Sequence, residues 1–267
     1  NTAVGSGALT SLTDADYCTA VGINALTALT TGNGNTAVGM NAGNAVTTGT
    51  GNCFVGDYSG RATTGGYNVA IGHQSGGPTT GTNSVAIGYG ALYSCTTGSA
   101  NVAVGKYAMR LNTTGDDNTA IGTAALDANT TGSSNTAVGG NSLDANTTGG
   151  ANTAVGKDAL GANTTAANNT AVGFSALPAN TTGANNTAIG AYSFEDNTTG
   201  ANNTGLGYFA LGNNTTASEN TAVGYYALSA NTSADRNTGV GFEALKLNQI
   251  GDRNTAVGYR ALATHAP

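Results

Sequence analysis

The sequence predicts an all-β fold, a parallel β-solenoid (β-roll) of about 16 coils with 17 residues in each coil. Three observations predict it. A short motif recurs at an almost constant spacing, the repeat is too short for a pair of helices, and 42 Gly, 33 Asn and 44 Thr dominate the 267 residues. The array covers residues 1–267 as a single domain. Neither end carries a capping coil, so we expect the chain to be an excerpt of a longer fibre.

The repeat is marked by the glycine that ends each NTAVG-like pentad. Thirteen of the 15 intervals between these marker glycines are 17 residues long and two are 16 residues long. The consensus N-T-A-V-G-x-x-A-L-x-x-N-T-T-G-x-x has β-branched residues between Gly and Asn corners, which predicts two short strands per coil, at NTAVG and at NTT. We expect the two short coils to keep their strands in register and to shorten the turn before Thr63 and before Thr79.

Stacked coils turn each consensus position into a column of similar residues. The residue before the marker glycine is always branched aliphatic, and the residue two positions earlier is Thr, Val or Cys, which have similar shapes. Both columns therefore predict side chains that face inward, together with the Leu column four residues after the marker. The second Asn column, Asn112 to Asn248, replaces Leu12, Leu29 and Val46 of earlier coils. We expect its amides to face inward and to bond to one another.

A column of small residues lies between the Thr and Val columns. It is Ala in 13 coils and is never polar, and strand alternation would send it outward. A strand face that lacks polar residues is typical of a sheet covered on both sides. We therefore expect side-by-side association of copies of this chain, as a homotrimer, through the column that includes Ala137, Ala154 and Ala171. The alternative is that Ala fits a tight corner.

The two positions after each marker glycine hold 11 of the 16 aromatic residues. The sequence predicts that these rings stack from coil to coil into a lateral ridge, about 5 Å apart. Two uses of such a ridge remain open: it can contact a glycan or another cell-surface receptor, or the rings can stack on each other or pack between neighbouring chains. The densest part of the predicted ridge consists of Tyr208, Phe209, Tyr225, Tyr226, Phe242 and Tyr259.

The composition argues against most chemistry. Charged residues make up 8% of the chain, the net charge is −6, and no basic cluster is present, so a nucleic-acid partner is not expected. No apolar run is long enough to insert into a membrane. No catalytic, cofactor-binding or metal-binding motif occurs, so the chain is not expected to be an enzyme. His73 and His265 are expected at the surface, and Cys18, Cys53 and Cys95 are expected to be buried free thiols because they fall in different columns.

Three pentads carry a resemblance to a known family. Asn68–Gly72 (NVAIG), Asn83–Gly88 (NSVAIG) and Asn101–Gly105 (NVAVG) resemble the head repeats of trimeric autotransporter adhesins. The full 17-residue unit is also similar to shaft repeats of phage tail fibres and related bacterial surface fibres. The resemblance implies a parallel β-roll that winds with two further copies around a threefold axis. It also implies an extracellular, cell-surface or virion location.

Together these observations predict a structural or adhesive fibre segment, the shaft or head of an extracellular or phage tail fibre, with no catalysis. The alternative is an ice-binding solenoid that uses Thr ladders. Ice-binding solenoids resemble T-x-T strands with two outward ranks of Thr, whereas the paired Thr of this repeat, such as Thr130 and Thr131, are adjacent, so alternation leaves one outward rank.

Overall fold

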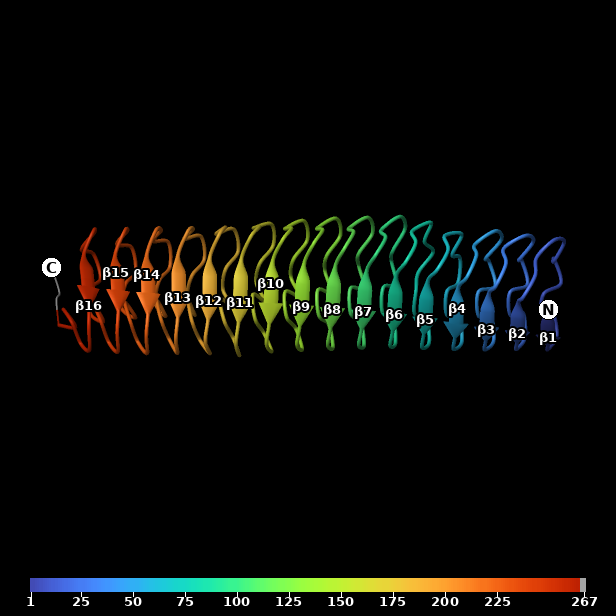
Figure 1. Cartoon of the computed structure of the whole chain (residues 1–267), viewed down its shortest axis with the longest axis horizontal. Coiled ribbons are helices and arrows are strands. Elements are labelled where there is room, and N and C mark those ends of the chain that lie inside the picture. The colour runs from blue at the N-terminus through green and yellow to red at the C-terminus, as the bar shows by residue number, and fades with distance from the viewer. Residues whose placement is uncertain (265–267) are drawn as a thin grey trace. The chain divides into compact units, whose positions relative to one another are not determined.

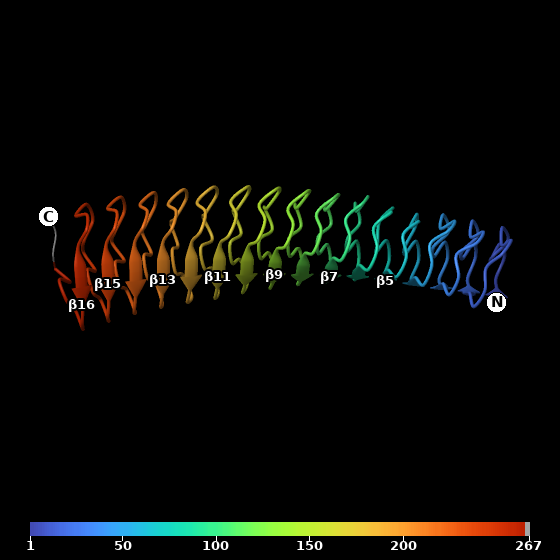
Figure 2. The same cartoon turned by 45° about the horizontal axis from the view of Figure 1, so that its top comes forward.

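The computed structural model describes residues 1–264, and these residues form a parallel β-solenoid that contains no helix. His265, expected at the surface, lies outside the described residues. The chain divides into two compact units, Asn1–Ser134 (unit 1) and Asn135–Pro267 (unit 2). Each unit contains eight strands of three residues, one in each coil. The strands form one wall of the coils and turns form the rest (Figure 2).

Within each unit the strands pair with their neighbours in parallel and in chain order (Figure 1). Every pair is in register, so that Thr153 pairs with Thr170, Ala154 with Ala171 and Val155 with Val172. The strands of unit 1 are β1 (Thr2–Val4), β2 (Thr19–Val21), β3 (Thr36–Val38), β4 (Cys53–Val55), β5 (Val69–Ile71), β6 (Val85–Ile87), β7 (Val102–Val104) and β8 (Thr119–Ile121). Those of unit 2 are β9 (Thr136–Val138), β10 (Thr153–Val155), β11 (Thr170–Val172), β12 (Thr187–Ile189), β13 (Thr204–Leu206), β14 (Thr221–Val223), β15 (Thr238–Val240) and β16 (Thr255–Val257).

The two 16-residue coils keep this register, as predicted, with Cys53 paired to Val69 and Val69 to Val85. The place of the shortened turn was predicted wrongly. Thr63 and Thr79 are buried, with exposed fractions of 1% and 4%, and they occupy the inward position that Asn takes in later coils. The missing residue is therefore lost from the turn after the Thr pair and not from the turn before it.

Each coil has one strand, and the second strand predicted at NTT does not form. The NTT segment is a bend, yet it still bonds to the next coil. The backbone N–H groups of Thr113 and Thr114 both donate to the carbonyl oxygen of Thr130, at 2.9 and 3.1 Å, and the Thr113 hydroxyl donates to the same oxygen at 2.9 Å. Because parallel strands are joined by evenly spaced bonds to different residues, convergence on one carbonyl explains why β-branched residues here make a corner.

Strands β2 to β16 bury their middle residue and leave the other two half-buried or exposed, which reverses the predicted orientation. Ala137, Ala154 and Ala171 are fully buried inside the coils, whereas Ile121 and Ile189 are 42% and 41% exposed. The prediction that this Ala column forms an interface between chains is therefore wrong, since no neighbour can reach it. The buried Leu column and the buried Asn columns fill the coil, so space under the strand remains only for a methyl group.

The two Asn columns form hydrogen-bonded ladders inside the coils. In the second column, the Asn163 amide nitrogen donates to Oδ1 of Asn146 at 2.9 Å, and that of Asn180 donates to Oδ1 of Asn163 at 3.0 Å. In the first column, Oδ1 of Asn152 accepts from the backbone N–H of Asn169 at 3.0 Å. The prediction that the second column faces inward and that its amides bond to one another is confirmed from Asn146 to Asn231, while Oδ1 of Asn231 and Oδ1 of Asn248 accept no hydrogen bond.

Phe54 is the single large residue in the Ala column, and glycines make room for it. Gly43 and Gly60 stand where most coils have the inward Leu. A Cβ atom built on Gly60 would lie 2.1 Å from the Phe54 ring, and one built on Gly43 would lie 2.8 Å from it. One phenyl ring in β4 therefore replaces two Leu side chains, those of its own coil and of the coil before it.

Candidate functional site

The outward residues of the strands form the first candidate surface, which we call the Thr/Val face. It consists of the first and third residues of each strand. The first residue is half-buried in most coils, and the third, Val, Ile or Leu, is half-buried or exposed. Val38, Val55 and Ile71 are 37–38% exposed. Each unit thus presents two adjacent ranks of mostly β-branched side chains along the solvent side of its sheet.

The second candidate surface is the aromatic ridge of unit 2. The structure brings together all six rings of the densest part of the predicted ridge, and Phe174 and Tyr192, which also follow marker glycines, extend it. Ring centroids lie 5.4 Å apart for Tyr208 and Tyr225, and 5.3 Å apart for both Tyr225–Phe242 and Phe242–Tyr259. The planes of these three pairs differ by only 4–16°. The ridge consists of Phe174, Tyr192, Tyr208, Phe209, Tyr225, Tyr226, Phe242 and Tyr259.

The stacking decides which part of each ring solvent can reach. Tyr208, Tyr225 and Phe242 are 41%, 46% and 39% exposed. Because neighbouring rings cover the faces of Tyr225 and Phe242, their edges account for this exposure. A sugar ring binds an aromatic residue by lying on its face, so the geometry favours rings that stack on each other over rings that hold a sugar.

Charged groups border the ridge at Tyr226. The Lys246 ammonium lies 5.3 Å from the centre of the Tyr226 ring and donates to the Glu243 carboxylate at 2.6 Å. Burial raises the pKa of the Tyr226 hydroxyl, and the neighbouring phenols of Tyr208 and Tyr225 raise it further. The hydroxyl is therefore a neutral hydrogen-bonding group at physiological pH.

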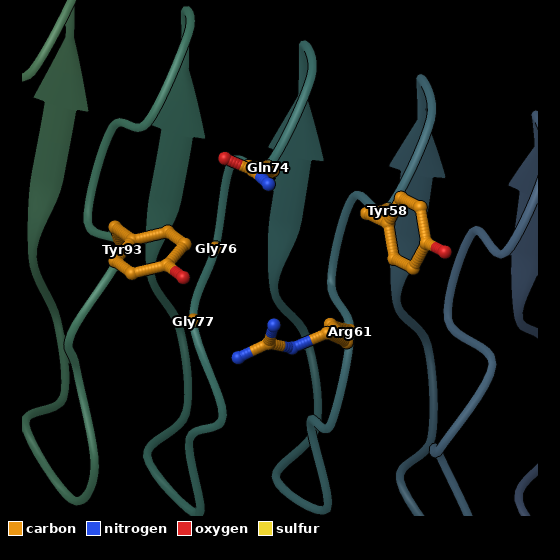
Figure 3. Close-up of a pocket in the computed structure, with 6 residues that line it drawn as sticks. All are labelled: Tyr58, Arg61, Gln74, Gly76, Gly77 and Tyr93. Carbon is orange, nitrogen blue, oxygen red and sulfur yellow. The ribbon is translucent and has the colours of Figure 1, made fainter.

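A shallow hollow in unit 1 forms a third candidate surface, which the sequence did not predict. The space that solvent can occupy in it is only about 10 Å³, room for about one water molecule. Figure 3 shows the Arg61 guanidinium pointing toward Gly77, with Gln74 near Gly76. The lining residues are Tyr58, Arg61, Gln74, Gly76, Gly77 and Tyr93.

The remaining reactive residues are dispersed. All three cysteines are free, as predicted; Cys18 and Cys95 are buried, but Cys53 is only half-buried because the Thr column it occupies faces outward. His73 lies at the surface, as predicted, with Nδ1 3.3 Å from the Asp57 carboxylate and its ring stacked on Tyr89. Within residues 1–264, no three His, Cys, Asp or Glu side chains lie close enough together to hold a metal ion. The same part of the chain has no helix that could span a membrane.

Comparison with known proteins gave no match: no family model, no curated protein and no solved structure is similar to this chain.

Proposed function

We propose that the chain is a structural segment of an extracellular fibre, the shaft or head of a cell-surface or phage tail fibre, in which three copies associate through their Thr/Val faces. The proposal includes no catalysis. The observation that carries it is the uninterrupted exposure of that face. The strands already bury Ala on their inner side, and parallel sheets are typically covered on both faces.

The energetics support association. Complete burial of a Val or Ile side chain contributes about 1.5–3 kcal/mol, so covering the exposed two-fifths of one such residue contributes about 0.6–1.2 kcal/mol. Eight coils in one unit repeat this contribution at regular intervals. The sum reaches several kcal/mol per unit before the Thr methyl groups are counted. The Thr/Val faces of two copies can also pack against each other in register, because their rows of side chains have the same spacing.

Three copies are proposed because of the resemblance of the NVAIG, NSVAIG and NVAVG pentads to fibre repeats that wind around a threefold axis. The proposed location, on a cell surface or a virion, rests on the same resemblance. The aromatic ridge is assigned a packing role, since its rings cover each other. A receptor or glycan contact on the ridge would use ring edges and phenol hydroxyls.

Light scattering coupled to size-exclusion chromatography tests the association. The native chain of 25.9 kDa should elute at about three times that mass. Val155→Lys, Val172→Lys and Ile189→Lys combined should give a folded monomer, because they place three charges on the Thr/Val face of β10, β11 and β12. A native chain that is monomeric at all concentrations would refute the proposal.

A matched control distinguishes disruption of the Thr/Val face from a general effect of three added charges. Thr148→Lys, Thr165→Lys and Thr182→Lys place three charges at exposed corners of unit 2. This variant should keep the native mass. If both triple variants dissociate equally, the Thr/Val face is not the interface.

Ice binding remains the second candidate, and one observation favours it more than the sequence did. The Thr column of the strands faces outward beside a Val column, so the sheet offers a rank of hydroxyls next to a rank of methyls. A thermal-hysteresis assay distinguishes the two functions. Under the fibre proposal the native chain shows no hysteresis; a clear hysteresis that is lost in Thr153→Lys combined with Thr170→Lys would replace that proposal with ice binding.

A further inference from the structure

Three tyrosine rings of the aromatic ridge lie together in two successive coils. Tyr208 follows β13, and Tyr225 and Tyr226 follow β14. The centroid of the Tyr208 ring lies 5.4 Å from that of Tyr225 and 5.7 Å from that of Tyr226. The centroids of Tyr225 and Tyr226 lie 4.6 Å apart. The ridge therefore holds three phenols as mutual neighbours, and two of the three ring pairs join different coils.

The hydroxyl ends of these three rings are also close together. Besides burial, the neighbouring phenols of Tyr208 and Tyr225 raise the pKa of Tyr226, so the three oxygen atoms are near enough to influence one another. Solvent reaches the group, since Tyr208 and Tyr225 are both exposed. A small oxidant in solution can therefore reach phenols whose reactive ends are adjacent.

Adjacent phenols have a well-defined oxidation chemistry. Loss of one electron and of the hydroxyl proton turns a tyrosine into a phenoxyl radical, whose unpaired electron lies partly on the carbon atoms beside the oxygen. Two such radicals in contact form a carbon–carbon bond, each bonded carbon then loses its hydrogen as a proton, and each oxygen regains a proton. The net change is the loss of two electrons and two protons. We propose that one-electron oxidants join Tyr208 to Tyr225 or Tyr226 in this way and so link the coils of β13 and β14 covalently.

A phenylalanine limits the coupling on the C-terminal side of this group. Phe242 stacks on Tyr225 with the ring centroids 5.3 Å apart, and Tyr259 stacks on Phe242 at the same distance. A phenylalanine ring has no hydroxyl hydrogen to lose, so it cannot couple with a neighbouring phenol by this route. Tyr259 thus belongs to the same ridge but is separated from the three phenols by one inert ring, which makes it an internal control.

Photo-oxidation of the 267-residue chain with tris(bipyridine)ruthenium(II) and persulfate tests the proposal, because persulfate accepts the two electrons and becomes two sulfate ions. The single-chain band is taken from a denaturing gel, which removes products linked between copies, and is cleaved after glutamate. Cleavage at the three glutamates gives the fragments 1–195, 196–219, 220–243 and 244–267. Tyr208 is the only tyrosine of the second fragment, and Tyr225 and Tyr226 are the only tyrosines of the third.

Mass spectrometry should find 196–219 joined to 220–243. The joined pair should be lighter by two hydrogen atoms than the sum of the two fragments. Fragment 244–267 should stay unlinked, because Phe242 separates Tyr259 from the nearest phenol. Absence of the joined pair, or linkage of 244–267 to an equal extent, would overturn the proposal.

A variant that removes one phenol tests the assigned residues. Tyr208→Phe keeps an aromatic ring at this place in the ridge, so the coil should stay folded, as circular dichroism confirms. The pair of 196–219 with 220–243 should disappear, since the first of these fragments then contains no tyrosine. A pair that persists in this variant would show that the bond is not a link between tyrosines, which overturns the proposal.

A second variant tests whether contact within the ridge decides which rings couple. Phe242→Tyr places a phenol between Tyr225 and Tyr259, with ring centroids 5.3 Å from each. Fragment 220–243 should then join 244–267, and failure to do so would contradict the role of ring contact. The bond forms within one chain, so the inference does not depend on association through the Thr/Val face, whose test is molecular mass.

Discussion

At the residue scale, the marker glycine sets how closely successive coils approach. Gly156 has a φ of +133°, a region that L side chains rarely adopt, and a Cβ atom there would lie 2.2 Å from the carbonyl oxygen of Gly173. Its own N–H donates to the carbonyl oxygen of Val138 at 2.8 Å. The glycine is thus required twice, by its dihedral angle and by the backbone of the next coil.

Gly156→Ala should therefore destabilise the protein by about 2–4 kcal/mol, because both strain and a backbone clash follow. Gly161→Ala, five residues later in the same coil, is the matched control. A Cβ atom on Gly161 has its nearest neighbour at 3.4 Å, an ordinary contact with Asp144, so that change should cost less than about 0.5 kcal/mol. Chemical denaturation of both variants measures the difference. Equal costs would contradict the geometric role of the marker glycine.

The sequence predicts the columns correctly but assigns the strand to the wrong face. Val is more apolar than Ala, and hydrophobicity alone therefore places Val155 inside and Ala154 outside. The structure does the opposite, because the coil interior is narrow and Ala fits beneath the strand where Val does not. The volume of the side chain therefore determines which strand residues face inward. The space available inside the coil is known only from the three-dimensional structure.

At the scale of the single coil, packing is governed by pairs of positions. Most coils combine a small strand residue with an inward Leu, as Ala154 and Leu160 do. The coil of β4 reverses this arrangement, with Phe54 in the strand and Gly60 at the Leu position. Both arrangements fill one volume, so either partner exchanged alone must create a void or a clash.

A double-mutant cycle on this pair should give a large favourable coupling. Phe54→Ala alone should cost about 3–5 kcal/mol because it leaves a cavity, and Gly60→Leu alone should cost about 1–3 kcal/mol because the new side chain meets the ring. Combined, they recreate the common arrangement within this coil and should recover much of the lost stability, but not all of it, because the space that the Phe54 ring fills at Gly43 stays empty. Thermal and urea unfolding of the four proteins measure the coupling. Costs that simply add would show that the two positions do not share one space.

The sequence predicts one of the two side-chain surfaces, the aromatic ridge, but not the hollow. The aromatic ridge follows from spacing alone, because Tyr225, Phe242 and Tyr259 are one period apart and must stack. The hollow at Gly77 does not, since it depends on Arg61 reaching across a coil to a ring two coils away. In the sequence, Arg61, Gly77 and Tyr93 follow one another in the column five residues after the marker glycine. This succession indicates a gap only when the dimensions of a coil are known.

At the scale of the whole molecule, the buried polar groups are almost all amides and hydroxyls, which do not titrate. The two carboxylates with shifted pKa values, Asp127 and Glu243, change the pH dependence of stability in opposite directions. Burial, partly offset by Arg110, raises the pKa of Asp127, so acidification through that pKa favours the folded state. The hydrogen bond from Lys246 lowers the pKa of Glu243, so its contribution is present above the unfolded value and is lost as pH falls through the folded one.

The melting temperature should therefore change by less than about 4 °C between pH 7 and pH 3, as judged by circular dichroism. Acid unfolding of most proteins comes from carboxylates that are paired in the folded state, and this chain has 14 acidic residues in total. A loss of melting temperature much larger than this near pH 4 would show that surface ion pairs, and not the amide ladders, carry the stability. The variant Asp127→Asn should steepen the loss on the acid side, because it removes the group whose raised pKa offsets the contribution of Glu243.

The exchange between Phe54 and its glycines also labels one place along a nearly uniform chain. In an array of identical repeats, a segment can shift by one whole repeat and still meet side chains of the same kind. The shifted and the native registers then have similar free energies. A strand β4 displaced by one coil toward the N-terminus would instead press the Phe54 ring against the Leu26 side chain, since glycine occupies the Leu column only at Gly43, Gly60 and Gly76. Phe54 thus disfavours a shifted register and helps to set the correct pairing of coils during folding.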